Sequence, residues 1–115
     1  MIKLYHNAHW SKSRKSVEIL NGMGLDFEII EYLKSGLTIN ELKDISKKLN
    51  LKANEFIRFN DTIFKEKPAL KKIAKHSELL QLIVKYPKII QRPIIINNNK
   101  AIIARPPDKI EEFLL

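Results

Sequence analysis

The arginines are the side chains of this sequence best suited to hold an anion. The chain has 115 residues and carries 17 lysines but only four arginines, which are Arg14, Arg58, Arg92 and Arg105. A lysine-rich composition would supply lysine at an indifferent surface position. The planar guanidinium group is needed where an oxyanion is held by several donors or where a cation stacks on an aromatic ring. The pattern therefore favours an oxyanion site. The structural alternatives are a solvated or ion-paired side chain for Arg14, carboxylate pairs at the strand ends for Arg92 and Arg105, and a surface position on a short helix for Arg58.

A second set of candidate donors lies in the segment that follows the first apolar run. We expect a loop from His6 to Trp10 that opens onto a helix, and the amino end of a helix presents free N–H groups and a positive dipole potential. The side chain of Asn7, the backbone amides from Trp10 to Ser13, and the hydroxyls of Ser11 and Ser13 could bind phosphate or sulfate there.

The sequence contains no cysteine. This excludes a disulfide framework, a thiolate metal site and a cysteine nucleophile. No spacing among His6, His9 and His76 is typical of a metal site, and we predict none. His6 has an ordinary pKa near 6.5, so it is a possible acid–base group, although a hydrogen-bonded loop histidine is the simpler interpretation.

The formal net charge is +8, and it suggests an anionic partner. Because the lysines are scattered along the chain rather than gathered in one block, we expect a surface that attracts small anions and no nucleic-acid partner. No apolar run approaches the roughly 20 residues needed to cross a bilayer, and the first residues lack a long apolar stretch of the signal-peptide kind. We expect a cytoplasmic protein with no membrane partner.

The elements that must position these groups begin with a βαβ unit. Apolar residues predict strands over 2–5 and 27–32. Ser11 can cap a helix between them that runs to about Met23 and stops at Gly22 and Gly24. Short connections predict parallel strands.

The middle of the chain is expected to be helical and the end to be ββα. Thr38 and Glu41 match a capping box, and Asn50 suits a left-handed terminator. Further helices are expected over 54–59 and from Ser77 through Ile83 before Pro87. Strands over 94–96 and 101–103 are joined by a turn of asparagines, and Pro106 and Pro107 open a last helix.

Five motifs occur in one order along the chain. They are YHNAHWSKSR (5–14), EYLKSGLTINEL (31–42), FIRFND (56–61), KYPKIIQRPIII (85–96) and ARPPDKI (104–110). In this order they resemble the glutaredoxin-coupled arsenate reductase family, which also contains the Spx-type transcriptional regulators. The resemblance covers essentially the whole chain.

The resemblance implies an α/β, thioredoxin-like fold with βαβ and ββα halves, forming a single domain over 1–115 with a helical insert at about 37–90. It implies a cis peptide before Pro93. It places Arg58, Arg92 and Arg105 around the oxyanion, with Arg14 matching the arginine of the first loop. Family members use glutathione and glutaredoxin as reductants, and we expect no bound cofactor.

The departure from the family falls at Trp10, which stands where the family has its cysteine. Ala8 replaces the family's proline, and His6 matches the histidine thought to favour the thiolate. An indole forms neither a thiolate nor a mixed disulfide. Trp10 can swing outward as an aromatic platform for a protein partner, stack on an arginine in a cation–π contact of about 0.5–2 kcal/mol, or simply cover apolar surface. We favour the stacked arrangement, which partly fills the oxyanion pocket.

Three functions follow from this sequence, and whether the chain is an enzyme stays open. The first is a member of the arsenate reductase family that is redox-inactive and keeps an arginine-lined site for arsenate, phosphate or sulfate. The second is an Spx-like protein-interaction or transcription-regulatory module that binds through the Trp10 face. The third is an enzyme of altered chemistry, with His6 as the acid–base group and the arginines clamping a phosphoryl or carboxylate substrate.

Overall fold

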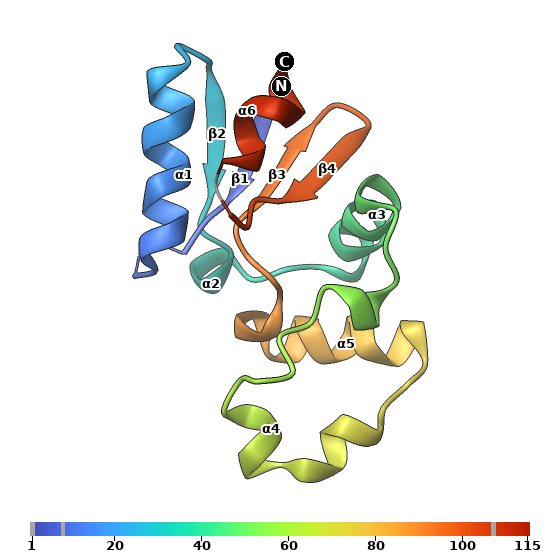
Figure 1. Ribbon diagram of the computed structural model, residues 1–115. Coiled ribbons are helices and arrows are strands. Elements are labelled where there is room, and N and C mark those ends of the chain that lie inside the picture. The colour runs from blue at the N-terminus through green and yellow to red at the C-terminus, as the bar shows by residue number, and fades with distance from the viewer. Residues whose placement is uncertain (1, 8, 107) are drawn as a thin grey trace. The chain divides into compact units, whose positions relative to one another are not determined.

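The chain forms two compact units, shown in the computed structural model of Figure 1, which describes residues 2–7, 9–106 and 108–115. One unit, here the sheet unit, consists of Met1–Ser35 and Arg92–Leu115. The other, the helical unit, consists of Gly36–Gln91.

A four-stranded sheet in the order β2-β1-β3-β4 organises the sheet unit. β1 pairs in parallel with β2, placing Leu4 opposite Ile29, and antiparallel with β3, placing Leu4 opposite Ile95. β3 and β4 form an antiparallel hairpin. The predicted βαβ and ββα halves are thus confirmed, and the mixed sheet is that of a thioredoxin-like fold. The strands are β1 (Ile2–Tyr5), β2 (Phe27–Ile30), β3 (Ile94–Asn97) and β4 (Lys100–Ile103).

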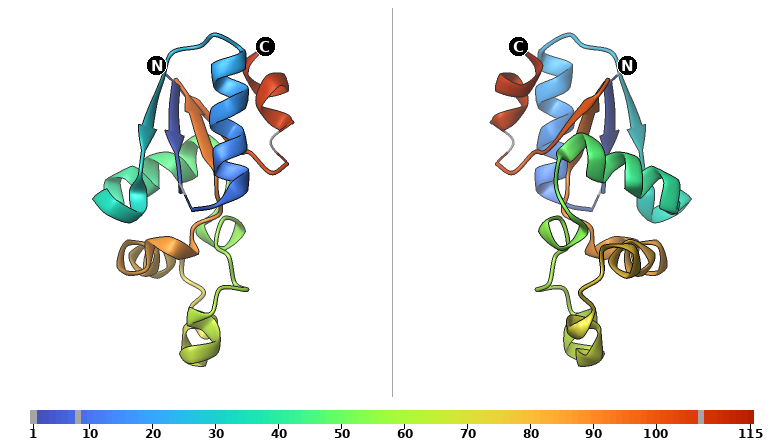
Figure 2. Two further views of the ribbon diagram at one scale, coloured as in Figure 1. Left: turned by 90° about the vertical axis from the view of Figure 1, so that its left-hand side faces the viewer. Right: turned by 90° about the vertical axis from the view of Figure 1, so that its right-hand side faces the viewer.

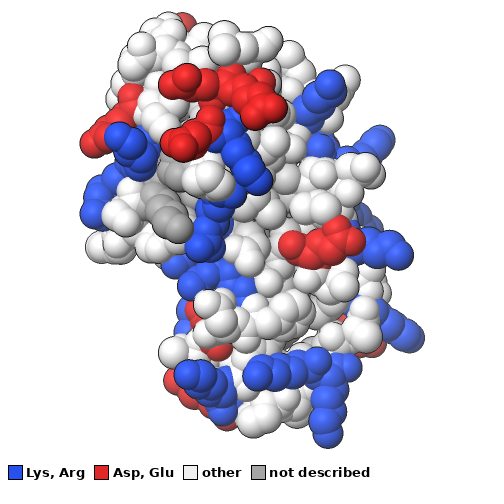
Figure 3. Space-filling view, viewed as in Figure 1, with Lys and Arg blue, Asp and Glu red and all other residues white. Residues whose placement is uncertain are grey.

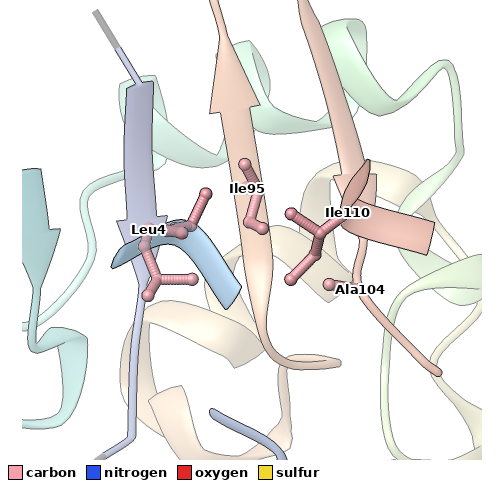
Figure 4. Packing of buried hydrophobic residues seen from close by; sticks show 5 residues of the cluster. Leu4, Ile95, Ala104 and Ile110 are labelled. Atoms are coloured by element: carbon pink, nitrogen blue, oxygen red, sulfur yellow. The ribbon is translucent and has the colours of Figure 1, made fainter. Parts of the chain in front are cut away.

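The core of the sheet unit lies between the sheet and two helices. Helices α1 (Ser11–Gly22) and α6 (Lys109–Leu114) cover the same face of the sheet (Figure 2). Leu4, Ile95 and Ile110 are fully buried and pack together (Figure 4). Alternation of side chains along the strands explains this, because Leu4 and Ile95 are paired residues whose side chains share one face of the sheet.

Turns in the sheet unit follow the predicted chemistry. Asn98 adopts φ 56° in the two-residue turn between β3 and β4, and Gly24 adopts φ 70° after α1. Asparagine and glycine tolerate this left-handed region at little cost, which confirms the predicted hairpin and the end of the first helix.

Two predicted boundaries in the sheet unit are wrong. The second strand ends at Ile30 rather than at Tyr32, because Tyr32 is fully buried and begins the short helix α2 (Tyr32–Ser35). The last helix begins at Lys109 rather than at Pro106, because a turn closed by the Lys109 N–H and the Pro106 carbonyl precedes it. The expected contribution of Pro107 lies outside the described residues.

In the helical unit, α3 (Ile39–Leu49) begins and ends as its sequence predicts. Thr38 Oγ1 accepts from the Glu41 N–H at 3.1 Å, and Glu41 Oε1 accepts from the Thr38 N–H at 3.1 Å, completing the capping box. Asn50 ends the helix at φ 57°. Helix α5 (His76–Lys85) starts one residue before the predicted Ser77 and ends ahead of Pro87, burying Leu79, Leu80 and Ile83.

The helix predicted over 54–59 is wrong. Only a 3₁₀ turn, η1 (Ala53–Glu55), forms there, and Ile57 then makes an antiparallel bridge with Ile90. The Arg58 N–H donates to the Ile89 carbonyl at 2.6 Å. This pairing needs extended backbone, so it competes with helix formation. The remaining elements of the unit are α4 (Ile63–Glu66), η2 (Pro68–Lys72) and η3 (Pro87–Ile89).

Lysines and arginines are spread over most of the face seen in Figure 3, whereas most of its acidic side chains gather near the top of the view. Within the described part of the chain, no helix has both the length and the apolar character that a membrane span requires.

Candidate functional site

Asn7 organises the loop between β1 and α1. Its side-chain Oδ1 accepts from the His9 N–H at 3.1 Å, and its carbonyl accepts from the Trp10 N–H at 3.0 Å. Its own N–H donates to Ser13 Oγ at 3.4 Å. These three bonds tie the loop to the first turn of α1 and fix the direction in which Trp10 leaves the backbone.

The first turn of α1 differs from the prediction in its cap. Trp10, with extended backbone, is the N-cap residue and makes no side-chain capping bond, so the prediction that Ser11 caps the helix is wrong. The hydroxyl that holds this turn belongs to Ser13, which is fully buried and accepts from Asn7. Ser11 is exposed, and the Arg14 N–H closes the first helical turn on the Trp10 carbonyl at 3.2 Å.

These contacts show which of the predicted anion donors are already used within the loop. The Trp10 amide already donates within the loop, so it is not a free donor, and Ser13 acts as an acceptor for the backbone. Helix geometry leaves the amide of Ser11 without an intrahelical acceptor. Asn7 uses its oxygen in the loop, which leaves its amide NH₂ group as the donor end of that side chain. The guanidinium-bearing side chain of Arg14 is exposed on α1.

Trp10 stacks with two arginines. The Cζ atom of Arg92 lies 4.6 Å from the centroid of the indole, and the Cζ atom of Arg105 lies 4.9 Å from it. Both distances are within the range of cation–π contacts. The predicted stacking of Trp10 on an arginine is confirmed, and it involves two guanidinium groups rather than one. We call Trp10, Arg92 and Arg105 the tryptophan cluster.

The two arginines reach Trp10 from the ends of the β3–β4 hairpin. Arg92 precedes β3 through a cis peptide bond to Pro93, as predicted, and its side chain is only 9% exposed. Arg105 follows β4, where the Ala104 N–H donates to the Pro93 carbonyl at 2.8 Å. The hairpin thus brings residues 13 positions apart in sequence to one aromatic ring.

The tryptophan cluster concentrates positive charge around a neutral ring. The face of the indole attracts each guanidinium through its quadrupole, so it offsets part of the repulsion between the two cations without neutralising either. An indole contact therefore leaves the positive potential of the cluster in place.

His6 is a buried neutral group rather than an exposed cation. It is 8% exposed, and its Nδ1 has no hydrogen-bond partner among the described residues. Burial lowers the pKa of His6 below 6.5, the negative charge of Glu31 opposes that change, and the positive charge of Arg14 adds to it. The ring is therefore neutral near pH 7.

A cavity of about 190 Å³ lies beside His6 in the sheet unit. Its lining includes Asn7, Glu31 and Lys34, and the Lys34 Nζ lies 3.5 Å from Glu31 Oε2 in an exposed ion pair. In the described part of the chain, no set of three or more His, Asp and Glu side chains is arranged to hold a metal ion.

Arg58 lies in the helical unit and has local partners. Its Nη1 is 3.3 Å from Asp61 Oδ2 and donates to the Lys88 carbonyl at 3.2 Å. Lys88 Nζ is 3.3 Å from Asp61 Oδ1, which also accepts from the Ile63 N–H at 3.0 Å. We call Arg58, Asp61 and Lys88 the aspartate cluster. The joint role of Arg58 with Arg92 and Arg105 around an anion stays a prediction.

Sequence reasoning missed two parts of this arrangement. Arg58 and Asp61 are three residues apart in FIRFND, but this spacing indicates an ion pair only on a helix, and none forms there. The bond from the Asn7 N–H to Ser13 Oγ had no signal in the sequence either, because it depends on how the loop folds back onto α1.

Comparison with known proteins places the chain among relatives of its own size. Residues 5–113 match the ArsC family. An arsenate reductase of Neisseria meningitidis serogroup A is 36% identical over 114 residues, covering 98% of this chain and 97% of that protein. An arsenate reductase of Haemophilus influenzae is 36% identical over 112 residues, covering 96% of this chain and 97% of that protein. The structure of an arsenate reductase from Vibrio cholerae matches with a TM-score of 0.89 and 29% identity, covering 96% of this chain and 95% of that one.

Proposed function

Because this chain belongs to the ArsC family, we propose that it is an arsenate-reductase-like protein without thiol redox activity, and that it binds a small oxyanion such as arsenate, phosphate or sulfate at the tryptophan cluster. The absence of cysteine from the sequence supports the first part, since no residue can form the thiolate on which a glutathione- and glutaredoxin-dependent reduction depends. In the family resemblance, Trp10 takes the position of the missing cysteine.

The observation that carries the second part is the convergence of Arg92 and Arg105 on one ring. A guanidinium stacks through its flat face, whereas its N–H donors point outward in its own plane. A guanidinium that lies flat on the Trp10 ring therefore keeps its N–H donors directed away from the ring, where an oxyanion can accept from them. The ring restricts the rotamers of both arginines, which lowers the entropy lost when an anion is bound.

Titration with arsenate, phosphate and sulfate tests this proposal. Trp10 is the only tryptophan, so its fluorescence reports on the cluster alone. We expect each anion to change this fluorescence saturably at millimolar concentration and to give matching heats in calorimetry. Arg92→Gln and Arg105→Gln should each weaken binding about tenfold, since hydrogen bonds to charged groups contribute about 1.5–3 kcal/mol.

Lys3→Gln is the matched control, because Lys3 is an exposed cation of the same unit and is not one of the three residues of the cluster. Binding that falls equally in Lys3→Gln would reduce the effect to general surface charge. No fluorescence or heat change with any of the three anions would overturn the proposal.

The other two functions have less support. A protein-interaction module that binds through Trp10 needs an accessible indole face, and this ring already contacts two guanidinium groups. An altered enzyme with His6 as the acid–base group needs a ring that substrate can reach, and His6 is 8% exposed. Recovery of one stable partner from the native host, lost in Trp10→Ala, would favour the interaction module.

A further inference from the structure

The helical unit contains a cavity of about 600 Å³, which we call the insert cavity. It is formed where α3, η1 and α5 meet, and its lining is partly polar, from Ser46, Lys52, Asn54 and His76, and partly apolar. Its volume lies in the range of roughly 300–1,000 Å³ that is typical of small-molecule sites. The tryptophan cluster belongs to the other unit, so this cavity is not part of the site proposed above.

A hydrogen bond sets the orientation of the His76 ring in the lining. Its Nδ1 accepts from the Ala53 N–H at 3.1 Å, and Ala53 is fully buried. Because Nδ1 acts as an acceptor, Nε2 is the ring nitrogen that carries a proton. The remaining polar atom of this side chain is therefore a donor.

The charge of the lining favours an anion. Lys52 is the charged residue of the lining, and none of the described residues that line the cavity is acidic. Helix α5 starts at His76 without a side-chain cap, so the positive end of its dipole lies at the same wall, offset in part by Glu78 in its first turn. Ser46 donates its hydroxyl to the Leu51 carbonyl, so it is not a donor for the anion.

The apolar part of the lining favours a ligand with a hydrophobic body. Ala74 contributes an exposed methyl group, and the buried side chains of Ala53 and Leu79 form the floor of the cavity beneath it. A bare phosphate or sulfate ion would leave this surface unused, whereas an aliphatic or aromatic group would be transferred from water onto it.

We infer that the insert cavity binds a small organic anion, with its carboxylate or phosphate group held by Lys52 and the Nε2–H of His76 and its apolar body against Ala74 and the floor formed by Ala53 and Leu79. A carboxylate and a phosphate group are both recognised by hydrogen-bond donors and positive charge, and the titration below distinguishes between them.

The test follows backbone amide resonances of the full chain during titration with benzoate, phenyl phosphate, inorganic phosphate and benzyl alcohol at millimolar concentration. We expect shifts at Ala53, Asn54 and His76 with benzoate, phenyl phosphate or both, and smaller ones with inorganic phosphate and benzyl alcohol, each of which offers only half of the ligand. The indole resonance of Trp10 reports separately on the other site, so failure of one proposal does not hide the outcome of the other.

Lys52→Gln should weaken binding about three- to tenfold, the effect of losing one hydrogen bond or ion pair. Lys43→Gln is the matched control, because Lys43 is an exposed lysine of α3 that does not line the cavity. The inference is overturned if neither organic anion shifts Ala53, Asn54 or His76, if benzyl alcohol binds as well as both, or if the two lysine variants weaken binding equally.

Discussion

The tryptophan cluster and the aspartate cluster place arginines beside chemically different partners within one chain. Arg92 and Arg105 lie 4.6 and 4.9 Å from the centroid of a neutral indole ring. Arg58 lies 3.3 Å from a carboxylate that Lys88 also contacts. The neutral indole does not neutralise the guanidinium charge, whereas the carboxylate of Asp61 offsets the charge of Arg58. The comparison teaches that the partner of an arginine, rather than its presence in a motif, decides whether it can bind an external anion.

The largest expected effect comes from returning sulfur to the tryptophan cluster. Trp10→Cys places a thiol at the position that the family resemblance assigns to the nucleophile, beside two arginines that already bind an oxyanion in our proposal. We expect arsenate reduction with glutathione and glutaredoxin to rise from the level of the blank to measurable turnover.

Trp10→Ser is the control for this gain, because it has the same size as cysteine and no redox-active atom. Turnover by purified wild-type protein, with host reductase removed, would contradict the proposal that this protein has no redox activity. No gain in Trp10→Cys would show that the cluster no longer matches the family's catalytic geometry.

The next largest effect is on stability and belongs to the aspartate cluster. Arg58→Ala removes the ion pair with Asp61 and the bond to the Lys88 carbonyl, and both charged side chains of the pair are mostly buried, at 18% and 10% exposed. We expect the free energy of unfolding in urea to fall by about 1–3 kcal/mol.

Lys43→Ala, at an exposed position, should change stability by less than about 0.5 kcal/mol. The arsenate affinity of the same Arg58→Ala protein tests whether Arg58 also contributes to anion binding. Unchanged affinity would assign Arg58 to structure alone, and a tenfold loss would support its predicted place around the anion.

Particular residues show how far the sequence could predict this structure. The capping box at Thr38 and Glu41 and the positive φ at Asn50 and Asn98 were predictable, because each depends on residues adjacent in the chain. The helix predicted over 54–59 failed, because Ile57 pairs with Ile90, 33 residues further on. Local propensity cannot include such a partner.

The candidate site was also predictable only in part. Motif order predicted which arginines matter, and Arg92 and Arg105 do converge on Trp10. That the ring contacts two arginines rather than one could not be predicted, since its position depends on the bonds that Asn7 makes to Trp10 and Ser13. The cap assigned to Ser11 failed for a related reason, because the fold of the loop makes Trp10 the N-cap.

The aspartate cluster should also give acid sensitivity below pH 3.8. Burial raises the pKa of Asp61, but the bonds from the Ile63 amide and Lys88 and the charges of Lys88 and Arg58 outweigh it and hold that pKa below 3.8. The stability this provides is complete above the unfolded pKa and is lost as the pH falls through the folded value. Asp61→Asn should therefore flatten the dependence of unfolding free energy on pH in this window, and an unchanged slope would contradict the assignment.

His6 should give a weaker dependence at higher pH. Its folded pKa is lowered from 6.5 by burial, so the folded state binds fewer protons than the unfolded state between the two values. Stability should rise with pH from the folded pKa up to about 6.5 and stay level above it. His6→Gln removes this titration, and urea unfolding from pH 5 to 8 should show the slope in wild type only. A slope of the same size in His6→Gln would assign it to another group.

The smallest expected effect separates stacking from simple coverage at Trp10. If the indole acts through its π face, Trp10→Phe keeps a weaker quadrupole and should lower the free energy of unfolding by less than about 1 kcal/mol, whereas Trp10→Leu removes the face and should cost about 0.5–2 kcal/mol. If the indole only covers apolar surface, leucine and phenylalanine should substitute equally well. Adding Arg105→Gln to each variant gives a double-mutant cycle, and a coupling energy near zero for Trp10 with Arg105 would show that the observed 4.9 Å contact contributes nothing to stability.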